Sequence, residues 1–259
     1  MMGSAMTWDD NLEKQSVLGV SISVSSYDQV VTRSLAWAAR RESRTLCFAP
    51  VHMIMEAVDD PVFRDRLNAA DMVNPDGMPV VWALRLLGKR KAQRVYGPDA
   101  TLAVLTAAEK AGVPVGFYGG SQPVLDALIY RVRALHPSLD IAFHESPPFR
   151  ALTAAEDNAV INRIASSGAR LLFVGLGCPK QENWIFDHRD RVPAVMFAVG
   201  AAFDFIAGSK RQAPRWMMAH GLEWVFRFAT EPRRLAMRYI KHNPRFVFFL
   251  LRQLLTGRV

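Results

Sequence analysis

Two glycines and two polar residues follow a short apolar run in the second half of the chain. The run Leu171–Val174 ends in Gly175-x-Gly177, and Lys180 and Gln181 come soon afterwards in a stretch of helical character. Glycines after a buried strand let a ligand approach the backbone, and the N-terminus of the next helix stabilises an anion by roughly 0.3–1 kcal/mol per charge. The pattern predicts a phosphate-binding turn, although a single Gly-x-Gly is as often a tight structural turn.

A carboxylate stands in a second turn, Pro75-Asp76-Gly77. A carboxylate held between Pro and Gly at a strand end faces the crevice where α/β folds bind substrates, so Asp76 is the candidate for acid–base chemistry. Capping of the following helix is the more frequent role for an aspartate at this spacing. Asp99, after Gly97-Pro98, is predicted to be such a cap. Arg85 and Arg94 could bind a phosphate or pair with these carboxylates.

Neither a metal site nor a cofactor is expected. The six histidines lack metal-ligand spacing, and the chain contains no Asp-x-Asp pair. An enzyme that handles a nucleotide sugar would therefore neutralise its leaving group with Arg, Lys and helix N-termini. The two cysteines, Cys47 and Cys178, give no disulfide framework, which fits a reducing cytoplasm.

Alternating elements must position these residues. Apolar segments predict strands at Thr45–Phe48, Asp71–Asn74, Val113–Tyr118, Leu139–Phe143, Arg170–Val174 and Ala194–Val199, with a further β-rich segment at Ser16–Val24. Helical patterns separate these strands, and such alternation predicts a Rossmann-like, mostly parallel sheet with helices on both faces. Ligands then bind at the carboxyl ends of the strands, where Gly119-Gly120 and Gly200 form further glycine turns.

Positive charge is concentrated near the C-terminus. Residues 209–259 hold eleven Lys and Arg against two Glu, a balance of +9, whereas the whole chain carries +8, which leaves residues 1–208 with −1. Basic residues interleaved with aromatics suit nucleic acid or an anionic membrane surface, and a solvated helical face is the plainer alternative. We predict a flexible leader (1–15), an α/β catalytic domain (16–208) and a basic, helical, membrane-associating appendage (209–259).

Six segments in one order carry a family pattern. They are Asn74–Gly88, Arg94–Asp99, Val174–Glu182, Val199–Gly208, Gln212–Trp216, and Gly221–Trp224 with Glu231–Leu235. Each segment is weak by itself, but together they resemble the WecG/TagA/CpsF glycosyltransferase family. The resemblance covers roughly Ser16 to the C-terminus.

The resemblance implies an inverting, metal-independent enzyme that moves a sugar from a UDP-sugar to a polyprenyl-diphosphate-linked sugar. Such an enzyme is cytoplasmic, lies peripherally on the inner face of the plasma membrane, serves exopolysaccharide or cell-surface polymer synthesis, and can form homo-oligomers. Asp76 matches the family's general base, and Gln181 matches a glutamine of the same site. Arg227 and Arg234 match appendage arginines that reach the diphosphate. The expected substrate-binding residues are Arg85, Arg94, Asp99, Gly119, Gly120, Gly175, Gly177, Lys180, Glu182 and Arg238.

One segment departs from the family pattern. Phe48-Ala49-Pro50 stands where the family has Thr-x-Asn, so two polar side chains are missing and activity or sugar preference is expected to differ. The donor sugar cannot be deduced from the motifs. A dinucleotide-dependent oxidoreductase is disfavoured because no Gly-x-Gly-x-x-Gly opens a helix with an acidic residue about 20 positions later. We expect no nucleic-acid partner, but an α/β protein that binds nucleic acid through its basic tail remains the alternative.

Overall fold

The computed structural model describes residues 12–257, except for the side chain of Arg234. Most of the predicted leader lies outside these residues. The first strand, β1 (Lys14–Val17), includes Lys14 and Gln15, which the sequence analysis assigned to the leader.

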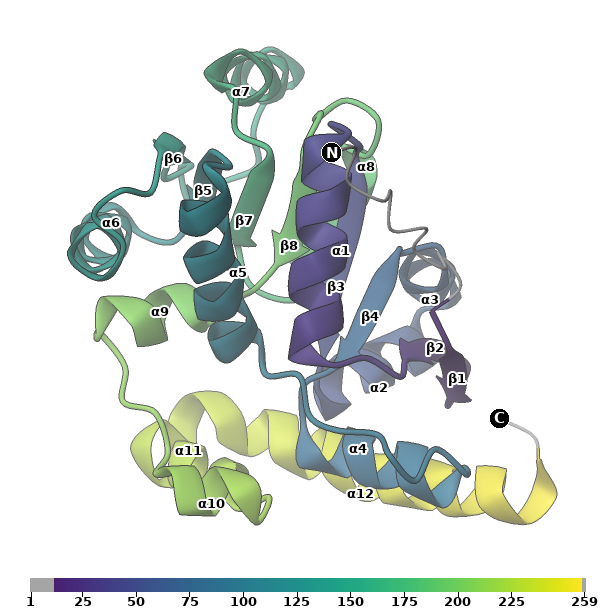
Figure 1. Ribbon diagram of the computed structural model, residues 1–259. Helices are drawn as coiled ribbons and strands as arrows, with labels where there is room; N and C mark the ends of the chain where they lie inside the picture. Colours follow the sequence, from purple (N-terminus) through teal and green to yellow (C-terminus); the bar gives the residue numbers. More distant parts are fainter. Residues whose placement is uncertain (1–11, 258–259) are drawn as a thin grey trace, which may run out of the picture.

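A parallel sheet of six strands forms the centre of the molecule, in the order β4-β3-β8-β7-β5-β6 (Figure 1). The strands are β3 (Arg44–Ala49), β4 (Met72–Pro75), β5 (Val115–Gly119), β6 (Ile141–Glu145), β7 (Leu171–Gly175) and β8 (Val195–Ala198). Strands covered on both faces are mostly apolar, which is why these segments were recognisable in the sequence, and the edge strand β6 is the most exposed of the six. The predicted Rossmann-like architecture is confirmed.

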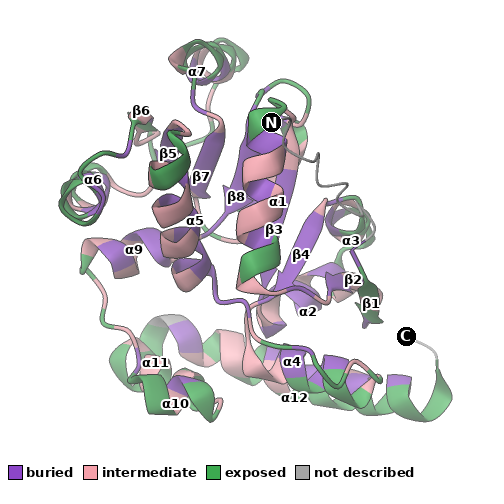
Figure 2. Ribbon diagram, in the orientation of Figure 1, coloured by how far each residue is buried: buried purple, intermediate pink, exposed green. Residues whose placement is uncertain are grey.

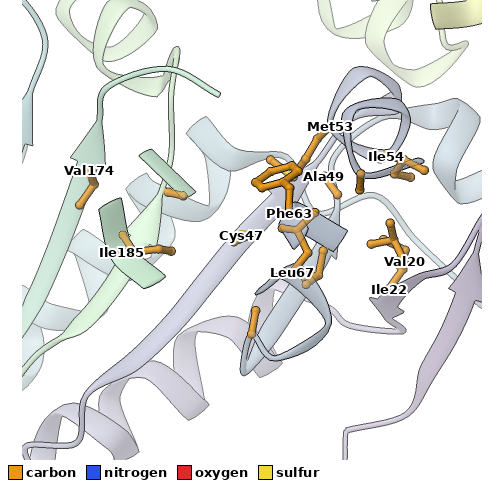
Figure 3. Close-up of a cluster of buried hydrophobic side chains, with 14 of the residues drawn as sticks. Val20, Ile22, Cys47, Ala49, Met53, Ile54, Phe63, Leu67, Val174 and Ile185 are labelled. Carbon is orange, nitrogen blue, oxygen red and sulfur yellow. The ribbon is translucent and has the colours of Figure 1, made fainter. Parts of the chain in front are cut away.

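Helices cover both faces of the sheet, and each face has its own hydrophobic core. One face carries α1 (Tyr27–Ala39), α5 (Gly97–Ala111), α6 (Gln122–Leu135) and α9 (Ala202–Ala207). The other carries α2 (Val51–Asp59), α3 (Pro61–Asn68), α4 (Met78–Leu86), α7 (Ala154–Ser167) and α8 (Lys180–Asp187). Successive residues of a strand point to opposite faces, so Leu46 and Phe48 enter the first core and Cys47 and Ala49 the second. Figure 3 shows Cys47 and Ala49 beside Phe63 of α3.

A small hairpin stands apart from the main sheet. The β-rich segment Ser16–Val24 folds into β1 and β2 (Val20–Ser23), which pair only with each other and are antiparallel. Leu18 and Gly19 at the turn have φ values of 51° and 84°, as a tight hairpin requires at both central positions.

The C-terminal region is helical, as predicted, and consists of α10 (Arg215–Ala219), α11 (Glu223–Thr230) and α12 (Pro232–Thr256). In Figure 1 these helices run beneath the body, and α12 packs against α2. Arg245 of α12 pairs with Asp59 of α2. At the far end of α12, the N–H of Leu18 donates to Gln253 Oε1 over 3.0 Å, so the hairpin is joined to the appendage. No helix within residues 12–257 is long and apolar enough to cross a membrane.

Candidate active site

A cavity of about 260 Å³ lies at the carboxyl ends of β3, β4, β7 and β8. The turns after these strands form its inner wall, and residues of α10, α11 and α12 close its other side. The site predicted at the strand ends is therefore completed by the appendage. Of the candidates from the sequence, the cavity is lined by Asp76, Arg94, Gly177, Gln181, Arg227 and Arg238.

Asp76 occupies the turn between β4 and α4 and faces the cavity. Asp76 does not cap the helix. The N-cap position of α4 is occupied by Gly77, and no side chain forms a capping hydrogen bond there. Burial raises the pKa of the Asp76 carboxyl to about 6, against the opposing effect of Arg94, and its Oδ1 has no hydrogen-bond partner. A buried carboxylate with a pKa near neutrality and one oxygen free of hydrogen bonds is suited to accept a proton from a substrate.

The apolar wall beside Asp76 comes from the segment that departs from the family pattern. Phe48 and Pro50 line the cavity, and Phe48 is 4% exposed. The Phe48 ring faces Gly97, where an added Cβ would make ordinary van der Waals contact with it at 3.5 Å. Phe48 and Pro50 stand where the family resemblance led us to expect two polar side chains, and their apolar surface favours the protonated form of a neighbouring carboxyl.

Cationic groups line the cavity close to Asp76. Arg94 Nη2 lies 3.7 Å from Asp76 Oδ1 but only 2.6 Å from Glu223 Oε2 of α11. Arg227 Nη1 lies 3.9 Å from the other oxygen of Glu223, and its buried Nε has no hydrogen-bond partner. Arg238 of α12 lines the same cavity. Guanidinium groups in this arrangement can bind a diphosphate.

Gln181 and Glu182 have different positions, although they are adjacent in α8. Gln181 lines the cavity, its Oε1 accepts from the N–H of Gly177 over 3.0 Å, and its Nε2 donates to Glu182 Oε1 over 2.8 Å. Glu182 is fully buried behind Gln181, where desolvation raises the pKa of its carboxyl to about 7. The predicted substrate-binding role of Glu182 is therefore replaced by a contact that orients Gln181.

Close packing accounts for Gly175 and Gly119, two of the four glycines proposed as ligand contacts, and a φ of 70° accounts for Gly120. A Cβ at Gly175 would lie 2.7 Å from the Phe203 ring, and a Cβ at Gly119 would lie 2.6 Å from the Gly175 backbone. The N–H of Gly120 donates to the Gly175 carbonyl over 2.9 Å. Only Gly177 of the four lines the cavity, and its φ of 82° explains the glycine there.

The remaining candidates lie outside the cavity lining. Asp99 is not the predicted cap, because Tyr96 is the N-cap of α5, and Asp99 instead pairs with Arg215 of α10 over 2.6 Å. Arg85 is exposed on α4 and donates to the carbonyl of Ala92. Lys180 is exposed at the start of α8. The side chain of Arg234 is outside the described part of the structure.

The sequence analysis missed Tyr96 and Glu223. Arg94 stacks on the Tyr96 ring, with its guanidinium carbon 4.2 Å from the ring centroid. Glu223 stands in the segment Gly221–Trp224, which was quoted as a motif without any role for the acid. The pattern that could have indicated a role for Glu223 is a carboxylate within a strongly basic region. Within residues 12–257, no cluster of three or more His, Cys, Asp or Glu could hold a metal ion.

The fold and the cavity define an α/β protein with a pocket, lined partly by arginines, at the carboxyl ends of its parallel strands. The chain belongs to the WecG/TagA/CpsF family of glycosyl transferases, which it matches over residues 15–259. The protein is thus a glycosyltransferase by family, which favours that prediction over a nucleic-acid-binding protein.

Several curated relatives share one name, N-acetylglucosaminyldiphosphoundecaprenol N-acetyl-beta-D-mannosaminyltransferase. The relative from Bacillus spizizenii is 32% identical over 198 residues, which are 76% of this chain and 74% of the relative. The relative from Bacillus subtilis is 30% identical over 179 residues, 69% of this chain and 68% of the relative. The relative from Staphylococcus aureus strain NCTC 8325 is 26% identical over 241 residues, 92% of each chain.

Proposed function

We propose that this protein transfers a sugar, with inversion, from a UDP-sugar to a hydroxyl of a polyprenyl-diphosphate-linked sugar. The observation that carries the proposal is the cavity that Asp76 lines together with Arg94, Arg227 and Arg238. The relatives act on an N-acetylglucosaminyl-diphosphoundecaprenol acceptor according to their name. We propose an acceptor of the same chemical class here.

The proposed reaction is a single displacement. Asp76 removes the proton from the acceptor hydroxyl while the oxygen attacks the anomeric carbon of the donor. The bond between that carbon and the UDP oxygen breaks on the opposite side, and its electron pair leaves with the diphosphate. Arg94 and Arg227 stabilise the negative charge that develops there. Arginine supplies this charge without a divalent cation, so we propose a metal-independent enzyme.

The appendage supplies a surface for the lipid. Six exposed apolar side chains form the outer face of α12: Met237, Ile240, Val247, Phe248, Leu251 and Leu255. At about 3.6 residues per turn they fall on one stripe, opposite the buried Leu235 and Phe246. Figure 2 shows exposed positions along the whole of α12. Lys241 and Arg252 on the same helix add positive charge, so we propose that this face rests on an anionic membrane.

A donor panel tests the function. UDP release is measured for a series of UDP-sugars, with and without a polyprenyl-diphosphate-linked N-acetylglucosamine in liposomes, and in the presence of EDTA. We expect release that depends on the acceptor and survives EDTA, and the active sugar identifies the donor. Loss of release in EDTA would contradict metal independence. If a folded protein bound UDP but released none from any donor, the result would indicate that Phe48 and Pro50 have altered the site so that it no longer performs this chemistry.

A further inference from the structure

Glu223 is the one acidic side chain of the appendage that lines the cavity among the described residues. It lies in the first turn of α11, directly after the turn through Gly221. Gly221 has a φ of 72°, and a Cβ there would lie 2.7 Å from Trp82 of α4. Close packing of this glycine on the body therefore brings Glu223 to Arg94, whereas Arg227 lies one turn further along the same helix. Its side chain is only 13% exposed.

The Glu223 carboxylate spans the two guanidinium groups that the reaction needs for the diphosphate. One oxygen lies 2.6 Å from Arg94 Nη2, and the other lies 3.9 Å from Arg227 Nη1. Arg94 is nearer to Glu223 than to Asp76, from which it is 3.7 Å away. A carboxylate placed between two arginines has the charge and the planar oxygen pair of a phosphate edge.

The contact of Glu223 with the two arginines leaves N–H donors unsatisfied, and a larger anion could accept from them. Two guanidinium groups offer about ten N–H donors, whereas a carboxylate has two oxygens. Consistent with this excess, the buried Nε of Arg227 has no hydrogen-bond partner. A diphosphate carries more oxygens and more negative charge, so it can satisfy both arginines at once. Moving Glu223 aside costs little core packing, because α11 has no buried residue.

We propose that Glu223 is a built-in substitute for the donor diphosphate: it holds Arg94 and Arg227 while the site is empty and is displaced when the nucleotide sugar binds. The inference rests on the proposed function. Glu223 then lowers the affinity for the nucleotide, because binding must include its displacement. It also keeps both arginines oriented between turnovers and raises the pKa of Asp76 through its negative charge.

Binding of UDP and of inorganic pyrophosphate to the full chain, measured by titration calorimetry, tests this inference. We expect Glu223→Gln and Glu223→Ala to bind both anions about 3- to 10-fold more tightly than the wild type, because the competing charge is gone. The matched control is Glu42→Gln, since Glu42 also bridges two arginines, Arg40 and Arg44, but does so outside the cavity. That variant should bind like the wild type.

Two further outcomes separate the inference from the function beneath it. If the wild type binds UDP and both Glu223 variants bind it equally or more weakly, Glu223 is a fixed support and the inference is overturned alone. If no form binds UDP or pyrophosphate, the proposed donor is wrong and the inference falls with it. A second readout compares two pH profiles of Glu223→Gln: the acidic limb of kcat/KM, which reports the free enzyme, should move to lower pH, whereas the limb of kcat, which reports the donor-bound enzyme, should stay in place because Glu223 has already been displaced there. A fixed Glu223 would shift both limbs.

Discussion

The α/β body and the appendage reach the same cavity but are held in place by different forces. The body positions Asp76 and Gln181 through buried strands and close glycine packing. The appendage leaves most of its large apolar side chains exposed, and it is joined to the body by a few buried side chains, such as Phe246 and Leu250, and by polar contacts. These include Arg94 with Glu223, Asp99 with Arg215, and Asp59 with Arg245.

This difference has a functional consequence. A carboxylate base needs a fixed position and a dry environment, which a packed core provides. Charges that must exchange a protein partner for a substrate need a substrate that replaces that partner, because a mostly buried ion pair such as Arg94 with Glu223 is costly to break when one charge is left alone. On the proposed function, the body supplies the base, and the appendage supplies charges that rearrange as the donor binds.

The largest effect should come from the base itself. Asp76→Asn removes the proton acceptor and is expected to lower kcat by about 10²–10⁴-fold, while UDP still binds. Turnover and UDP binding are measured on the same preparation. Asp65→Asn, on the exposed side of α3, is the control and should leave kcat unchanged. Near-normal turnover of Asp76→Asn would assign the base to another group.

A smaller loss is expected from the appendage. Arg227→Ala removes one cation facing the diphosphate and should lower kcat by about 10²–10³-fold, the usual cost of losing one such donor. Arg133→Ala, which alters an exposed arginine of α6, is the matched control. Thermal unfolding should change less than activity, because the Arg227 side chain is still 24% exposed and belongs to no hydrophobic core. Equal losses of activity and of stability would show that Arg227 supports the fold instead of the reaction.

The two regions also differ in how far the sequence could predict them. Buried parallel strands leave continuous apolar runs, so the strand ends and the turn with Asp76 could be located in advance. The role of a glycine is ambiguous in the sequence. Gly175 makes room for the Phe203 ring, whereas Gly177 lines the cavity. No local pattern separates these causes, because the contact partner lies elsewhere in the chain.

The sequence also could not predict side-chain roles that depend on contacts between distant segments. Asp99 has the spacing of a helix cap, but its partner Arg215 is more than 100 residues away in the chain. Glu182 was grouped with ligand contacts, although the rotation of α8 turns it into the core behind Gln181. Sequence patterns locate elements and strand ends, whereas the direction of each side chain depends on tertiary packing.

The pH dependence of catalysis tests the dry environment of the base. Since the pKa of Asp76 is about 6 in the folded protein, its basic form is lost as pH falls through 6. We expect kcat/KM to fall about tenfold per pH unit below that value and to level off above it. A limb near pH 4 would mean that water reaches Asp76 in the working enzyme and that the Phe48 wall does not exclude it.

The outer face of α12 should affect lipid contact without affecting the chemistry. Phe248→Ser with Leu251→Ser removes two of its apolar side chains and is expected to weaken binding to anionic vesicles by about 10-fold or more. UDP affinity should stay the same. Tyr130→Ser, which alters an exposed aromatic residue of the body, is the control for vesicle sedimentation. Unchanged sedimentation of the double variant would move the membrane contact to another surface.

The smallest expected effect concerns stability and comes from the buried carboxyl behind Gln181. The pKa of Glu182 is raised from 4.5 to about 7 on folding, so the folded protein binds this proton more tightly than the unfolded chain. Stability is therefore lost as pH rises from about 4.5 through 7. Glu182→Gln keeps an acceptor for Gln181 and removes the buried charge. We expect the variant to gain about 1–3 kcal/mol over the wild type at pH 8 and little at pH 5, measured by urea unfolding.

A surface carboxyl of the body should give the opposite dependence of stability on pH. Paired with Arg150, Glu156 has a pKa lowered to about 2, so its contribution is present above its ordinary value of 4.5 and is lost as pH falls toward 2. Glu156→Gln should therefore be less stable than the wild type at pH 8, and the difference should shrink below pH 4. If Glu182→Gln followed this pattern instead, its carboxyl would be ionised and paired in the folded protein, and the core behind Gln181 would be wetter than its burial indicates.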